Sequence, residues 1–350
     1  MRKETRHLIL ILITLSFFTI FHSGSVVSAQ TIKWKLPTAY PAGSYLWDFI
    51  AVNFANHVKS LSGGQLTIEP LTSGAIAPAL KVTETVKNQV SEAGHTWAGY
   101  EMGRDTTSLL FCGIPGGLSD EQYLAWYYEA DGEKLLQQWR KETMSVVSFT
   151  LGLGPTEIIH SHRAIRTLKD FQGLKMRTAG VWAELLPGLG ASAVILPASD
   201  VYQALEKKLV DAIEWADPGT NFPLGYHQVA KYIIVPGVHL PAWPWELVIH
   251  PKEWDKLTDS QKKIVQTAAK LTTYESLSKF TYKSIDAMTK FQKTGNEIIV
   301  LSDEVVQKVH QLADKWSQDQ ATKNPWFKKV YENQKAFKKA WNEAKYIRER

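Results

Sequence analysis

The stretch that decides the fold spans residues 171–215 and reads FQGLKMRTAGVWAELLPGLGASAVILPASDVYQALEKKLVDAIEW. It predicts a short strand that ends at Arg177, a helix, and a second apolar strand that ends at Glu214 and Trp215. Parallel strands joined in this way have their carboxyl ends at one edge of a sheet. We therefore expect these three side chains to lie together at the mouth of a cleft at this edge. A guanidinium beside an aromatic wall there suits a small organic carboxylate.

Strand-like and helix-like segments alternate on both sides of this stretch. Strand patterns at 31–37 and 65–70 flank a helical pattern at 45–61, which predicts a mostly parallel α/β sheet. A later helical pattern begins after Thr258 and reaches Phe291 without a proline. At 1.5 Å per residue, some thirty residues span about 45 Å, enough to lie across two domains.

The first 29 residues differ in kind from the rest. Basic Arg2, Lys3 and Arg6 precede an apolar run of 14 residues, Leu8–Phe21, and small residues follow at Val27–Ala29. This order predicts a cleaved secretory signal peptide and a periplasmic protein. The run is short for a membrane span of roughly 20 residues, so a retained anchor is the less favoured alternative.

Composition excludes several classes of protein. A chain of 350 residues with 44% hydrophobic and 21% charged residues is globular and long enough for two domains. Residues 1–29 carry three basic and one acidic side chain, so removing them lowers the net charge from +5 to +3. That excess is too small to indicate nucleic acid binding. The lone Cys112 excludes an intramolecular disulfide.

Catalytic motifs are missing from the sequence, and we predict that the protein is not an enzyme. It contains no Gly-x-Ser-x-Gly elbow, no His-Glu-x-x-His helix and no Walker loop. His160 and His162 lack a third ligand nearby in the sequence, so they do not indicate a zinc site.

Several motifs together resemble a known family, the DctP-type extracytoplasmic solute receptors of tripartite ATP-independent periplasmic (TRAP) transporters. The similarity covers nearly the whole mature chain and is nearest to the branch that binds 2-oxo and 2-hydroxy acids. The motifs that carry it are Ser62–Ile68, Asp170–Arg177, Tyr202–Leu205, Val210–Trp215, and Val229–Tyr232 before Pro236-Gly237.

The resemblance implies a two-domain, type II-like periplasmic binding protein fold of the α/β class. Hinge strands and a long helix would join the domains around a ligand cleft. Domain I would comprise residues 30–152 plus 244–285, and domain II residues 153–243 plus 286–350. The resemblance also implies that Arg177 forms a salt bridge with the ligand, and that closure of the cleft presents the protein to a sodium-driven TRAP permease.

The sequence departs from the oxo-acid branch where that branch binds a metal. The loop entering the second domain, 152–157, has no glutamine, and Leu240 stands where the branch has a glutamate. Only Glu214 and the Trp215 carbonyl remain as metal ligands. Two protein groups are too few for a hard cation, which takes about six oxygens. We therefore expect no cofactor, and a bound cation stays open as an alternative.

Other candidate ligand-binding residues follow predicted strand ends or lie in the loops nearby. Glu214 has three open roles: metal ligand, acceptor for a ligand hydroxyl, or acceptor for loop amides. For the aromatic candidates, packing within the core is the alternative. These further candidates are Tyr40, Trp97, Tyr100, Thr156, Trp182 and Trp243.

The sequence thus predicts a periplasmic receptor that captures a small organic acid and delivers it to a TRAP permease. A sensor subunit that feeds a signalling kinase would use the same kind of cleft and is the first alternative; a periplasmic enzyme is the second. The chemical identity of the acid and the oligomeric state, monomer or dimer, are not determined by the sequence.

Overall fold

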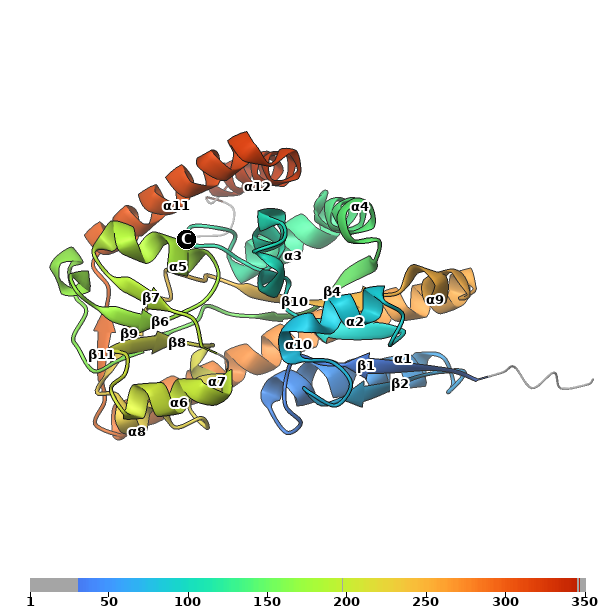
Figure 1. Ribbon diagram of the computed structural model, residues 1–350, viewed down its shortest axis with the longest axis horizontal. Helices are drawn as coiled ribbons and strands as arrows, with labels where there is room; N and C mark the ends of the chain where they lie inside the picture. Colours follow the sequence, from blue (N-terminus) through green and yellow to red (C-terminus); the bar gives the residue numbers. More distant parts are fainter. Residues whose placement is uncertain (1–30, 197, 345, 347–350) are drawn as a thin grey trace, which may run out of the picture. The chain divides into compact units, whose positions relative to one another are not determined.

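A computed structural model describes residues 31–196, 198–344 and 346 (Figure 1). The predicted signal peptide lies outside the described residues. Eleven strands in the described part form three sheets. The first pairs β1 (Ile32–Pro37) with β2 (Leu66–Leu71); the second has the order β3 (Ala93–Thr96), β10 (Trp243–Ile249), β4 (Val147–Gly154); the third has the order β11 (Glu297–Val300), β9 (Tyr232–Val235), β5 (Ile159–Ser161), β8 (Ala212–Glu214), β6 (Lys175–Arg177), β7 (Ser192–Val194).

The sheets are mixed, so the prediction of a mostly parallel sheet is wrong. Strand β10 runs antiparallel to both of its neighbours, and β5 runs antiparallel to β8 and β9. The other pairs, β1 with β2, β9 with β11, and β6 with β7 and β8, are parallel. Local strand–helix alternation cannot reveal this, because β10 enters its sheet from a distant part of the chain.

Helices surround the sheets. The α-helices are α1 (Asn53–Leu61), α2 (Val82–Lys87), α3 (Asp120–Glu129), α4 (Gly132–Met144), α5 (Val181–Leu185), α6 (Ala198–Glu206), α7 (Pro218–Asn221), α8 (Tyr226–Val229), α9 (Pro251–Asp255), α10 (Asp259–Lys293), α11 (Asp303–Lys323) and α12 (Pro325–Glu343). A π-helix, η1 (Trp47–Val52), precedes α1, and short 3₁₀ segments are η2 (Ala79–Lys81), η3 (Ala98–Glu101), η4 (Thr106–Phe111), η5 (Leu168–Phe171) and η6 (Leu186–Leu189). Within the described ranges, none of these helices has the length and apolarity of a membrane span.

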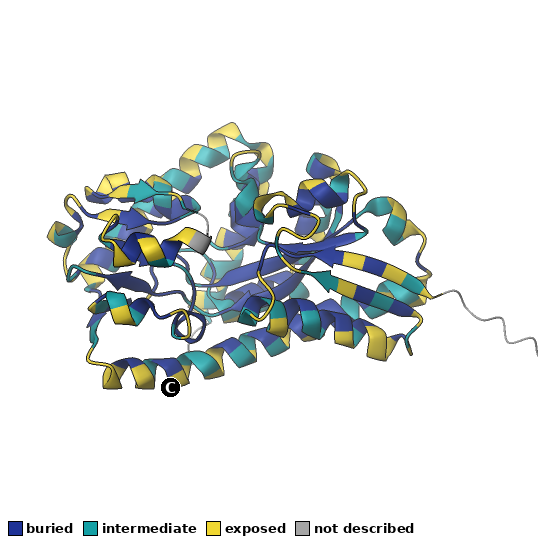
Figure 2. Cartoon of the chain, turned by 60° about the horizontal axis from the view of Figure 1, so that its bottom comes forward, coloured by how far each residue is buried: buried dark blue, intermediate teal, exposed yellow. Residues whose placement is uncertain are grey.

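The long helix α10 confirms the sequence prediction. Its 35 residues begin with a capping box in which Thr258 Oγ1 accepts from the Gln261 amide at 3.2 Å and Gln261 Oε1 accepts from the Thr258 amide at 2.9 Å. Such a cap satisfies amides that a helix start otherwise leaves unpaired. The helix contacts β4 of the second sheet and β11 of the third. Buried and exposed residues alternate along it (Figure 2).

A buried ion pair reinforces the core beside the second sheet. Arg140 on α4 is fully buried. Its Nε donates to Glu246 Oε1 on β10 at 2.6 Å, and its Nη1 donates to Glu101 Oε2 on η3 at 2.5 Å. Because each charge is paired and hydrogen-bonded, burial is tolerated. The pair fixes α4 and η3 to the middle strand of the sheet.

Candidate ligand-binding site

The parallel pairing of β6 and β8 places Arg177 beside Glu214. The register sets Arg177 opposite Ile213, so Glu214 follows at the strand end. Arg177 Nη1 donates to the Glu214 carbonyl oxygen at 2.8 Å and lies 3.3 Å from Glu214 Oε1, while Nη2 donates to the Leu196 carbonyl at 3.1 Å. The guanidinium carbon lies 5.0 Å from the centre of the Trp215 ring. The three side chains gather as the sequence predicts.

The Nε donor of Arg177 is unused. Its side chain is only 6% exposed, and its Nε has no hydrogen-bond partner among the described residues. A buried donor without a partner costs free energy comparable to a lost hydrogen bond. An incoming carboxylate that accepts from Nε would remove this cost.

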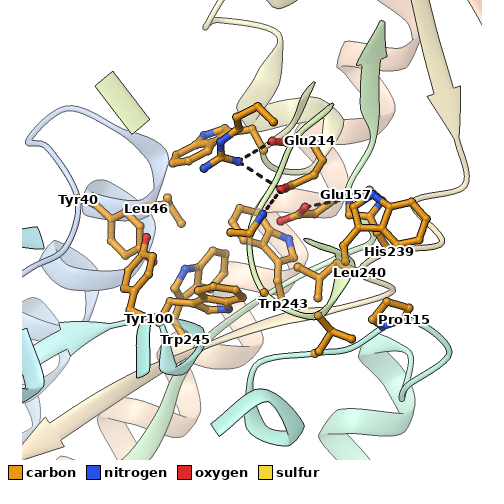
Figure 3. A pocket seen from close by; sticks show the side chains of 18 residues that line it. Tyr40, Leu46, Tyr100, Pro115, Glu157, Glu214, His239, Leu240, Trp243 and Trp245 are labelled. Atoms are coloured by element: carbon orange, nitrogen blue, oxygen red, sulfur yellow. Dashed lines mark hydrogen bonds and ion pairs between the residues drawn. The ribbon is translucent and has the colours of Figure 1, made fainter. Parts of the chain in front are cut away.

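A cavity next to Arg177 is lined by residues from several segments between Tyr40 and Trp245 (Figure 3). The cavity offers about 70 Å³ of space to a water-sized probe, well above the roughly 10–15 Å³ that one water molecule needs. Eight of the nine residues predicted to bind ligand line it: Tyr40, Trp97, Tyr100, Arg177, Trp182, Glu214, Trp215 and Trp243. The residues that line it as well, and that were not predicted to bind ligand, are Leu46, Gly113, Pro115, Glu157, Ala179, Gly180, Val181, His239, Leu240 and Trp245.

Thr156 is the predicted residue that lies outside the lining. Its hydroxyl is 3.4 Å from each of the carbonyl oxygens of Glu157, Gly237 and Leu240. These contacts hold the chain entering β5 against the loop after β9. Thr156 therefore helps to position Glu157.

Indole groups form one wall of the cavity. The Trp243 and Trp245 rings lie 4.1 Å apart, and neither indole Nε1 has a partner among the described residues. By contrast, Trp97 Nε1 donates to the Cys112 carbonyl and Trp182 Nε1 to the Met176 sulfur. The wall therefore offers apolar surface together with two unused hydrogen-bond donors.

Glu157 and His239 add a polar group that the sequence analysis missed. His239 Nε2 lies 3.1 Å from Glu157 Oε2, and both side chains are almost fully buried. Figure 3 shows Glu157 between Glu214 and His239. Gly237 allows this approach, because a Cβ there would come within 2.0 Å of the Glu157 carbonyl oxygen. One carboxylate oxygen or imidazole nitrogen from each of Glu157, Glu214 and His239 lies within 4.8 Å of the others.

Burial shapes the protonation of this group. Burial first, and then the neighbouring Glu214 carboxylate, raise the pKa of Glu157 well above its usual value. Burial lowers the pKa of His239 to about 4, so the imidazole is neutral at pH 7. Two carboxylates this close cannot both stay ionised without a compensating positive charge.

A model of the bacterial extracellular solute-binding protein family 7, of the DctP type, matches residues 40–324. The chain belongs to this family. Family 7 proteins and their fold are those of transport receptors, not of enzymes, which accords with the missing catalytic motifs.

Relatives of this family 7 chain bind small acids. It is 28% identical over 316 residues to a monocarboxylate 2-oxoacid-binding periplasmic protein of Nostoc sp., covering 89% of this chain and 86% of that protein. A TRAP periplasmic solute-binding protein of Pseudoalteromonas atlantica, solved with sodium and pyruvate, is 26% identical with a TM-score of 0.85 and covers 91% of this chain and 97% of its own. One of Colwellia psychrerythraea, solved with calcium and pyruvate, is 25% identical with a TM-score of 0.86 at the same coverage. The predicted two-domain periplasmic binding protein fold is confirmed.

These relatives also bear on the cation alternative, since they hold sodium or calcium with their ligand. The prediction that only Glu214 and the Trp215 carbonyl remain as metal ligands is wrong for this family 7 chain, because Glu157 and His239 lie beside Glu214. Leu240 does line the cavity, and its neighbour His239 supplies the missing donor. The set contains a nitrogen, however, whereas sodium and calcium favour sites made of oxygen alone. The donor set therefore does not fit the cations of the solved relatives.

Proposed function

We propose that this family 7 protein works in the periplasm as the receptor of a TRAP transporter, binds a small monocarboxylate of the 2-oxo acid class and delivers it to the membrane permease. The observation that carries the proposal is Arg177. It is a buried, permanently charged group that lines a largely apolar cavity and keeps its Nε donor unused. A carboxylate is the ligand group that a guanidinium fork binds best.

The size and walls of the cavity support a compact acid. A cavity of about 70 Å³ suits a small ligand. The unused indole donors of Trp243 and Trp245 could bind a second oxygen, such as the 2-oxo group. The names of the relatives point the same way, since they include a 2-oxoacid-binding protein and two receptors solved with pyruvate.

We propose that binding closes the two predicted domains on the ligand. Several features support domain I as 30–152 plus 244–285 and domain II as 153–243 plus 286–350. The three-stranded sheet falls almost wholly in the first and the six-stranded sheet wholly in the second. Arg177 and Glu214 then come from domain II, while Tyr40 and Trp97 come from domain I.

Calorimetry on the mature chain, unfolded and refolded to release any co-purified ligand, tests the proposal. The panel is pyruvate, 2-oxobutyrate, lactate, benzoate and the neutral amide pyruvamide. We expect the 2-oxo acids to bind with micromolar Kd, and pyruvamide to bind at least tenfold more weakly because it lacks the charge that Arg177 pairs. Equal binding of pyruvate and pyruvamide, or no binding of any acid, would refute the proposal.

A further inference from the structure

We propose that Glu157, Glu214 and His239 form a site for a borderline divalent cation, Zn²⁺ above all, in place of the sodium or calcium of the solved relatives. The proposal rests on the proposed function in one respect, namely that the same cavity receives the organic acid. It concerns residues of this chain that come together from three separate segments: the entry to β5, the end of β8 and the loop after β9.

The donor atoms argue for this class of metal. Zinc binds imidazole nitrogen and carboxylate oxygen, often with three protein ligands and one open position. Calcium takes six to eight oxygens, and an imidazole contributes none. Two carboxylates and one imidazole within 4.8 Å therefore match zinc better than calcium or sodium.

The remaining contacts leave the donor atoms available. Glu214 uses Oε1 to accept from the Ala179 amide at 2.9 Å and from Arg177, which orients the carboxylate and leaves Oε2. His239 Nδ1 is buried and has no partner among the described residues. Glu157 is held in place through the contacts of Thr156 and Gly237 around its main chain. The Glu214 carboxylate and the Glu157 main chain are thus held in place, and His239 Nε2 lies 3.1 Å from Glu157 Oε2.

Charge balance gives an independent argument. With both carboxylates ionised, Glu157, Glu214 and Arg177 sum to −1, and a bound monocarboxylate makes the sum −2. Burying two uncompensated charges is costly. A divalent cation brings the cluster and its ligand to zero, whereas sodium leaves −1. A cation between Glu157 and Glu214 also removes the repulsion of the two carboxylates.

The test measures metal before it measures the acid. The mature chain is stripped with a chelator, dialysed against Zn²⁺, Ca²⁺ or Na⁺ without any organic acid, and its metal content and thermal midpoint are determined. We expect one Zn²⁺ per chain with a raised midpoint, and no displacement of Zn²⁺ by millimolar Ca²⁺. Zinc absent from the dialysed protein, or Ca²⁺ displacing it, would overturn the proposal.

Substitutions assign the site. Losing a group that merely orients a metal ligand costs about 10- to 100-fold in affinity, so His239→Gln, which loses the nitrogen ligand itself, should weaken Zn²⁺ binding by about 100-fold or more. His57→Gln is the matched control, because His57 Nε2 also lies 3.2 Å from a glutamate, Glu275, but away from the cavity. Unchanged Zn²⁺ affinity in His239→Gln, or equal losses in both variants, would overturn the assignment.

Acid binding separates this proposal from the proposed function. If Zn²⁺ binds through His239 but no acid binds, the proposed function is wrong and the metal site stands. Suppose instead that stripped and zinc-loaded protein bind pyruvate equally well, and that calorimetry in buffers of different ionisation enthalpy detects proton uptake. The metal site is then wrong and the proposed function stands. In that case a proton on the carboxylate pair supplies the positive charge.

Discussion

Arg177 Nη1 donates to two oxygens of Glu214, the main-chain carbonyl at 2.8 Å and the carboxylate Oε1 at 3.3 Å. With Nη2 on the Leu196 carbonyl, the guanidinium is fixed before any ligand arrives. A preorganised group loses little conformational freedom on binding, so more of its interaction energy appears as affinity.

Replacing this anchor should abolish most of the binding. We expect Arg177→Ala to lose about 2–5 kcal/mol of ligand affinity, because the ligand carboxylate is then buried without a partner. Arg177→Lys should also weaken binding, since a point charge cannot replace the fork. Calorimetry with pyruvate measures both losses. Arg163→Lys is the control, since Arg163 is half-buried and does not line the cavity. An affinity of Arg177→Ala within threefold of wild type would contradict the role of Arg177.

The indole wall depends on a glycine in the facing strand. Gly154 on β4 pairs with Trp243 on β10, and a Cβ at Gly154 would come within 2.1 Å of Trp243 Nε1. Gly154→Ala should push the indole from its place, costing about 1–3 kcal/mol of stability through overpacking and lowering ligand affinity.

Thermal denaturation and ligand titration of Gly154→Ala check this prediction. Gly103→Ala is the matched control, because nothing lies within 4 Å of a Cβ at Gly103 and its backbone is unstrained. If both variants bind as the wild type does, Trp243 does not shape the cavity.

The buried Arg140 makes a separate prediction about stability. Arg140→Met leaves the carboxylates of Glu246 and Glu101 without their partner, and breaking a buried pair from one side costs about 3–5 kcal/mol. Arg166→Met removes the partner of Glu297 in a half-exposed pair and should cost less than about 1 kcal/mol. Urea unfolding at pH 7 measures both variants; equal losses would show that burial of the Arg140 pair is not what matters.

His160 should make the protein less stable in acid. It lies buried on β5 between Tyr226 and Phe291, and burial lowers its pKa from 6.5 to about 3. The unfolded chain therefore binds a proton below about pH 6.5 that the folded chain refuses, so stability falls as the pH falls. From pH 7 to pH 5 this one residue should remove about 2 kcal/mol.

The measurement is the free energy of unfolding at pH 7 and pH 5 for wild type and His160→Leu. We expect the variant to lose about 2 kcal/mol less than wild type over this interval. His57→Leu serves as the control, because His57 is partly exposed and paired with Glu275. An identical pH dependence in His160→Leu and wild type would show that His160 is protonated in the folded state.

Part of the site could be predicted because local sequence encodes it. A strand, a helix and a parallel strand bring their carboxyl ends together by geometry alone, and this places Arg177, Glu214 and Trp215 correctly. The cap of α10 at Thr258 follows from local hydrogen bonding in the same way.

The rest of the site depends on contacts that sequence spacing does not reveal. Glu157 precedes an antiparallel strand, and His239 lies in a loop directly before Leu240, the position at which the oxo-acid branch has a glutamate. Glu157 itself was a signal in the sequence, because this glutamate occupies the position at which the oxo-acid branch has a glutamine. Their approach depends on Gly237 and Thr156, whose contacts form only when the loop after β9 meets the entry to β5.

The position of β10 between β3 and β4 governs when the chain can fold during synthesis. The middle strand of this sheet comes from residues 243–249, long after both of its neighbours have been made. A fragment that ends at Ala242 should therefore lack fixed tertiary structure in this sheet, which near-ultraviolet circular dichroism would reveal as a weak aromatic signal. For a chain that we propose is exported, late arrival of the central strand delays folding until most of the polypeptide is complete, and so lengthens the time in which it can be translocated unfolded.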